Sequence, residues 1–106
     1  MKVTINEIFE TTMERCGAVL CSKAEEYATG ADPFHNFHKA AELQKTTPIQ
    51  ALGGMMAKHT ISVYDMIETG KEYPIELWDE KICDHINYLL LLRAMVAEAT
   101  EEENNA

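Results

Sequence analysis

The sequence predicts an all-α fold, a bundle of four helices in a single domain. Three observations lead to this fold class. Apolar residues recur every three or four positions along four segments, and capping residues, prolines or glycines separate these segments. No segment shows the alternation of polar and β-branched residues that is typical of a strand. The domain is expected to span residues 1–100, and residues 101–106 are expected to form a frayed acidic tail.

The first two helices are expected to lie on either side of a glycine-containing turn. Thr4 and Glu7 have the spacing of a capping box, which predicts the start of the first helix. This helix is expected to end near Gly30. Asp32, followed by Pro33, then predicts the start of a short helix that continues to Leu43.

The third helix has signals at both of its ends. Thr47 followed by Pro48 predicts its start, and Gly70 predicts its end just after residue 69. Gly53 and Gly54 lie inside this helix, where each glycine costs about 1 kcal/mol relative to alanine. A close approach of another backbone or of a ligand is the expected explanation for them.

The fourth helix is expected to follow the turn at residues 71–74 and to carry an apolar stripe from Trp78 to Val96. Leu89–Leu92 make its second half apolar on all sides, as in a helix that is packed on two sides. A central helix in a compact monomer would have the same pattern. A homo-oligomer is nevertheless the favoured interpretation, because a chain of 106 residues buries a modest share of its surface alone.

Charge and composition exclude several classes of function. The net charge of −9 and the pI near 4.8 argue against binding to duplex nucleic acid, which requires clustered cations. No apolar run reaches the roughly 18 residues of a membrane span. Three cysteines without metal-binding spacing suggest reduced thiols and a cytoplasmic protein.

Polar residues on helix faces that are otherwise apolar indicate a ligand site. Glu80, Asp84 and Asn87 share one face of the fourth helix, which continues into leucine and methionine. Lys23 lies on the apolar stripe of the first helix, and Lys58 and Asp65 lie on the flank of the stripe of the third helix. Carboxylates could hold Mg²⁺, lysines could hold phosphates, and an aromatic ring could stack on a base. Alternatively, these side chains only pair with one another or tie down helix ends.

Residues Glu80–Leu90 resemble the metal-binding helix of the MazG-like all-α nucleoside triphosphate pyrophosphohydrolases. The wider pattern is similar to small phage and prophage proteins linked to nucleotide metabolism. It covers about residues 23–92 and consists of Lys23 to Tyr27, Phe34-x-Asn36-Phe37, Met55-Met56-x-Lys58 and Asp84-x-x-x-Tyr88.

This resemblance implies a MazG-like helix arrangement in a protein of phage origin, acting in the cytoplasm of a bacterial host. It also implies Mg²⁺-dependent cleavage between the α and β phosphates, which releases the monophosphate and pyrophosphate. Two positions depart from the family pattern, because Lys81 and Lys39 stand where acidic ligands are expected. The residues expected to act are Glu80 and Asp84 in catalysis; Glu80, Asp84, Glu42 and Asp65 toward Mg²⁺; and Lys23, Tyr27, Asn36, Lys58, Asn87 and Tyr88 toward the substrate.

Two main classes of function therefore fit the sequence. The first is a nucleotide pyrophosphohydrolase with an altered metal site. The second is a protein that binds or sequesters a nucleotide, or a molecule derived from one, without cleaving it. A structural adaptor that acts through its helical faces is a third possibility.

Overall fold

The computed structural model describes residues 2–26 and 33–105, with side-chain surroundings for residues 2–21 and 33–101. Within these ranges the chain is all-helical and contains no strand, which confirms the predicted fold class. The four helices are α1 (Ile5–Glu26), α2 (His35–Gln44), α3 (Pro48–Thr69) and α4 (Ile75–Asn105). None of the described helices is both long and apolar enough to cross a membrane.

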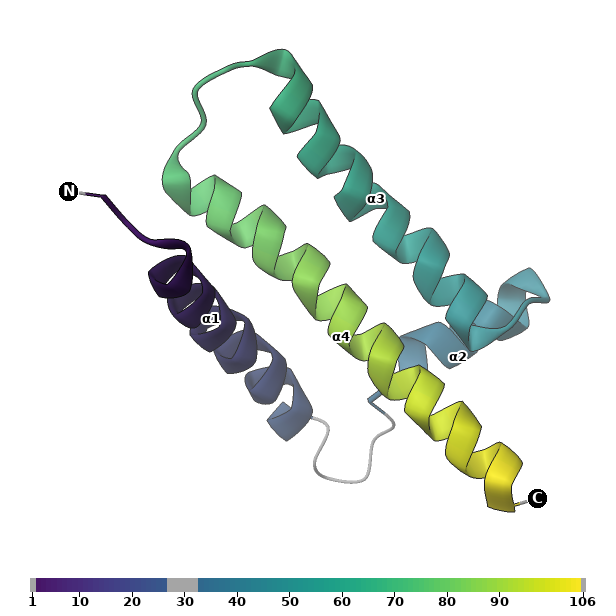
Figure 1. The fold of residues 1–106 in the computed structure, drawn as a ribbon. Coiled ribbons are helices and arrows are strands. Elements are labelled where there is room, and N and C mark those ends of the chain that lie inside the picture. The colour runs from purple at the N-terminus through teal and green to yellow at the C-terminus, as the bar shows by residue number, and fades with distance from the viewer. Residues whose placement is uncertain (1, 27–32, 106) are drawn as a thin grey trace.

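The longest helix, α4, lies in the middle of the molecule (Figure 1). Helix α3 packs along one side of α4 and runs in the opposite direction, and α1 packs along the other side in the same direction as α4. Helix α2 packs against α3, on the far side of the molecule in this view. Among the described residues α1 packs on α4 alone and α2 mainly on α3, so the three long helices form one layer, with α2 behind one end of it.

The helix ends show which sequence signals set the boundaries of the helices. At the start of α1, the Glu7 amide donates to the Thr4 hydroxyl, and the Thr4 amide donates to the Glu7 carboxylate. At the start of α3, Thr47 and Gln50 form the equivalent capping box. Gly70 ends α3 in the left-handed region, with a φ of 65° that glycine adopts without strain.

Two helix boundaries differ from the sequence prediction. Helix α2 begins at His35, and Phe34 occupies its N-cap position without a side-chain hydrogen bond to the helix. Asp32, the expected cap, and Gly30 lie outside the described residues. Helix α4 continues to Asn105, so the segment expected to be a frayed tail is helical up to that residue.

The expectation that another helix of this chain approaches Gly53 and Gly54 closely is wrong for the described residues, and the approach of a ligand stays a prediction. Both glycines are exposed, and no described atom outside their own helix turn lies within 4 Å of the position that a Cβ would take. The two glycines therefore lie in open space rather than under another helix.

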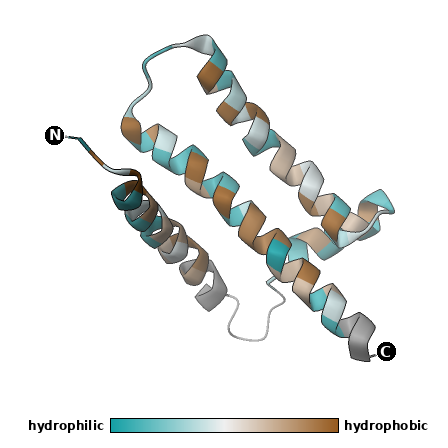
Figure 2. Ribbon diagram, viewed as in Figure 1, coloured by the Kyte–Doolittle hydropathy of each residue, from teal (hydrophilic) through white to brown (hydrophobic). Residues whose placement is uncertain are grey.

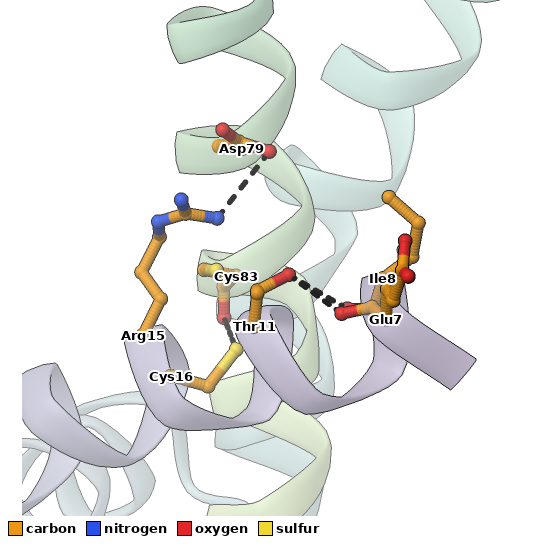
Figure 3. A network of polar contacts seen from close by, with 7 residues as sticks. All are labelled: Glu7, Ile8, Thr11, Arg15, Cys16, Asp79 and Cys83. Carbon is orange, nitrogen blue, oxygen red and sulfur yellow. Dashed lines mark hydrogen bonds and ion pairs between the residues drawn. The ribbon is translucent and has the colours of Figure 1, made fainter. Parts of the chain in front are cut away.

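The core lies where α2, α3 and α4 meet. Phe37, Leu52 and Met95 are buried there, one from each helix, and partly buried side chains surround them. These are Phe34, Met55, Met56, Tyr88, Leu91 and Leu92. A separate seam joins α1 to α4, where Cys16 is fully buried and Arg15 lies 3.4 Å from Asp79 (Figure 3).

Candidate functional site

A cavity of about 420 Å³ lies between all four helices, next to the core. Its size falls within the range of small-molecule sites, which is roughly 300–1,000 Å³. Most of its wall is apolar, and polar groups are contributed by α2, α3 and α4. Its lining consists of Val19, Leu20, Pro33, Phe34, Asn36, Phe37, Met55, His59, Asp84, Asn87, Tyr88, Leu90, Leu91 and Ala94.

Helix α4 brings the polar face predicted from the sequence to this cavity. Asp84, Asn87 and Leu91 recur every three or four residues, so they lie on one side of the helix, and all three line the cavity. Tyr88 lines it as well. Four of the expected site residues are therefore brought together, because Asn36 of α2 joins Asp84, Asn87 and Tyr88.

Asn87 is the most unusual residue of this wall. It is 8% exposed and is the one buried polar residue among those described. Its Oδ1 accepts no hydrogen bond from any described residue. A buried polar atom without a partner costs about 1–3 kcal/mol, and natural proteins contain few of them. The side chain therefore presents an unused acceptor in the wall of a cavity.

Aromatic rings support the same wall. The rings of His59 and Tyr88 lie 4.7 Å apart between centroids, with an interplanar angle of 37°. Phe37 meets Tyr88 edge-on at 6.3 Å. Because Tyr88 is held from two sides, by α2 and by α3, its orientation is set before any ligand enters. A planar ligand could stack against such preorganised rings.

The remaining expected residues lie elsewhere. Glu80 is exposed one turn before Asp84, and Lys58 and Asp65 are exposed on α3; none of the three lines the cavity. Glu42 is exposed on α2 and pairs with Lys39 at 3.4 Å. The side chain of Lys23 and the whole of Tyr27 lie outside the described residues.

The acidic residues do not fit the metal centre that the resemblance implies. Of the four expected ligands only Asp84 lines the cavity, and the other three are exposed on α2, α3 and α4. In the described ranges no group of three or more His, Cys, Asp or Glu side chains could hold a metal ion. Within the described residues Asp84 alone would hold Mg²⁺ at this cavity, together with water and substrate phosphates, without the several acidic ligands that the resemblance implies.

Sequence reasoning missed His59 as a site residue. The structure places it in the cavity wall against Tyr88. Its position four residues after Met55, which also lines the cavity, is the signal that could have revealed it. Phe34 and Phe37 were recognised as part of the sequence pattern, but without a role in the site.

Comparison of the chain with protein-family models, with curated proteins and with solved structures gave no match. The functional argument therefore depends on the cavity and its lining.

Proposed function

We propose that this protein binds a nucleotide, or a small molecule derived from one, and that the base lies in the cavity between the four helices. The observation that carries this proposal is the Oδ1 of Asn87, which is buried in the wall of that cavity without a hydrogen-bond partner among the described residues. A nucleobase is planar, matches the aromatic lining and carries N–H donors on its edge. Its insertion would supply the hydrogen bond that Asn87 lacks.

The two polar groups of α4 favour a particular kind of base. Asp84 and Asn87 are three residues apart on one helix face, so their side chains are neighbours. Asp84, when ionised, only accepts hydrogen bonds, and Asn87 has an acceptor free. Two neighbouring acceptors suit an edge that carries two donors, as guanine does with its N1–H and amino group. Bases with an amino group should therefore bind better than thymine or uracil.

The cavity offers fewer groups that could bind the phosphates of a nucleotide than groups that could bind its base. Among the described lining residues there is no lysine or arginine, and the net charge of −9 opposes a polyanion. We therefore expect the base to supply most of the affinity, and a nucleoside to compete with its own triphosphate. This behaviour is that of a binding or sequestering protein. The competing hypothesis is a MazG-like enzyme that hydrolyses the bound nucleotide.

Calorimetric titration with the four ribonucleosides and their mono- and triphosphates would test the proposal. Asp84→Asn should weaken binding of guanosine or its nucleotides roughly 10-fold or more, because a hydrogen bond to a charged group contributes about 1.5–3 kcal/mol. The matched control is Asp65→Asn, which removes an exposed carboxylate from α3 and should leave affinity unchanged. No binding of any nucleoside or nucleotide at millimolar concentration would refute the proposal.

The same samples distinguish binding from cleavage. After incubation with and without Mg²⁺, chromatography and mass spectrometry would identify the recovered nucleotide. Intact nucleotide released on denaturation supports the binding protein. Monophosphate and pyrophosphate that appear only with Mg²⁺, and are lost in Asp84→Ala, would establish the hydrolase instead.

A further inference from the structure

The face of α4 that lies opposite the cavity is apolar and uncovered. Four residues at intervals of seven form a stripe along it: Ile75, Ile82, Leu89 and Val96 are 65%, 40%, 48% and 41% exposed. Cavity-lining residues such as Asp84 and Asn87 lie about half a turn away around the helix. In Figure 1, α2 lies behind the layer of long helices and no element covers α4 from the front. Figure 2 shows hydrophobic bands along the length of this helix.

The start of α1 extends this apolar face. Ile5, Ile8 and Phe9 are exposed, and they line a groove together with Ile75, Trp78, Ile82 and Ile86 of α4. Together, the stripe on α4 and these three residues of α1 form what we call the α1/α4 face. It is far larger than the isolated hydrophobic residues that are normal on a monomer surface.

The solvent-accessible surface of the chain indicates how much area a second copy could bury. A compact monomer of 12.0 kDa exposes about 6,000 Å², whereas this chain exposes 8112 Å², an excess of about 2,100 Å². Its radius of gyration is 16.3 Å, against about 13 Å for a compact domain of this length. Stable homodimers bury about 1,000–2,500 Å² on each partner. One dimer interface would therefore account for the excess.

The charges beside the stripe allow two copies of the chain to place unlike charges next to each other. Asp79 and Arg93 flank it at equal distances on either side of Ile86, seven residues before and seven after. If two α4 helices cross in opposite directions around a two-fold axis near Ile86, Arg93 of each copy comes close to Asp79 of the other, where it would join the pair that Asp79 forms with Arg15 of its own chain at 3.4 Å. The apolar stripe is centred between residues 85 and 86, midway between Ile82 and Leu89, so the stripes and the charges favour registers that agree to within one residue.

We infer that the α1/α4 face is the interface of a homodimer in which the two α4 helices pack antiparallel. The interface leaves Asp84 and Asn87 of the cavity wall free, because they lie about half a turn around α4 from the stripe. Dimerisation is thus independent of the proposed binding function, and either can fail without the other.

Light scattering coupled to size exclusion would give the mass. We expect twice the 12.0 kDa of the chain at micromolar concentration. Leu89→Glu should give a folded monomer by circular dichroism. The matched control is Ile61→Glu, which changes an isoleucine on α3, away from the face, that is somewhat more exposed than Leu89, 59% against 48%. A monomer at 100 µM wild-type chain, or a dimer that Ile61→Glu disrupts and Leu89→Glu does not, would overturn the inference.

Cross-linking tests the register even if Leu89→Glu does not fold. The chain contains one exposed cysteine, Cys21, which is first changed to serine. A short bis-maleimide should then join Ile86→Cys to its copy. It should not join Ile75→Cys, whose two copies would lie about 30 Å apart. Efficient cross-linking of Ile75→Cys to its copy would show a parallel pair and overturn the antiparallel arrangement.

Discussion

Asn87 combines a stability cost with a binding opportunity. Its Oδ1 is buried without a partner among the described residues, and replacing such a group by an apolar one of similar shape is neutral or stabilising. We expect Asn87→Leu to raise the free energy of unfolding by about 1 kcal/mol, or about 4 °C in Tm, while abolishing ligand binding.

Thermal unfolding without ligand, at one fixed protein concentration, measures the effect. Leu43→Asn, which changes a residue 85% exposed on α2, serves as the reference for a surface exchange and should shift Tm by less than 1–2 °C. A Tm of Asn87→Leu several degrees below wild type would show that the amide has a structural role.

Cys16 gives the fold a dependence on alkaline pH. It is fully buried at the α1–α4 seam, where its thiol lies 4.0 Å from the carbonyl oxygen of Cys83. Burial, followed by the influence of Cys83, raises the pKa of the Cys16 thiol from 9.0 to about 11. The folded state therefore favours the protonated thiol, and this contribution is fully present below pH 9 and is lost as pH rises towards 11.

Urea unfolding between pH 8 and pH 11 would show this decline. In Cys16→Ala the part of the slope that belongs to this thiol should disappear, although stability at pH 8 also falls because a small cavity is left. At pH 8, iodoacetamide should modify exposed Cys21 well before Cys16. Equal rates for the two thiols would contradict the assignment.

At the scale of the helices, Gly53 and Gly54 weaken α3 without any visible packing reason. A Cβ at either position would meet no described atom within 4 Å. Gly53→Ala and Gly54→Ala should each stabilise the protein by about 0.5–1 kcal/mol, because alanine restricts the unfolded chain and favours the helix.

Gly70→Ala is the contrasting variant. Its φ of 65° disfavours alanine, so it should lower Tm by several degrees while the two α3 variants raise it. A loss of stability in Gly53→Ala would mean that another molecule approaches α3 there.

Helix ends were the part of the fold that the sequence predicted best. Thr47, Pro48 and Gly70 determine both ends of α3 through local hydrogen bonds and φ preferences, which need no tertiary information. The start of α2 was missed because Phe34 caps it without a side-chain bond. The order of the helices in space was also beyond reach, because periodicity gives the buried face of a helix but not its neighbour.

Only some residues of the candidate site could be predicted from the sequence. Asp84 and Asn87 were recognised because they share a face of one helix, and Tyr88 was recognised through the resemblance. On α3 the sequence favoured Lys58, yet its neighbour His59 lines the cavity. Adjacent residues point about 100° apart around a helix, so only the rotation of α3 against α4 decides between them.

At the scale of the molecule, an apolar dimer interface makes stability depend on protein concentration. If the folded dimer is the stable species, Tm should rise as the chain is concentrated. Tm measured from 2 to 200 µM should increase for wild type and for Ile61→Glu, and should stay constant for Leu89→Glu. A constant wild-type Tm over this range would contradict a dimer that forms on folding.

The single seam that holds α1 has a kinetic consequence. In the described chain α1 packs only on α4, yet Val19 and Leu20 form part of the cavity wall. The inferred dimer interface covers only the start of α1, so the end of α1 that carries Val19 and Leu20 can separate from α4 and open the cavity. The rate of this opening would then limit the rate of ligand exchange. Amide hydrogen exchange should be faster in α1 than in α3, and exchange in α1 should slow when a ligand fills the cavity.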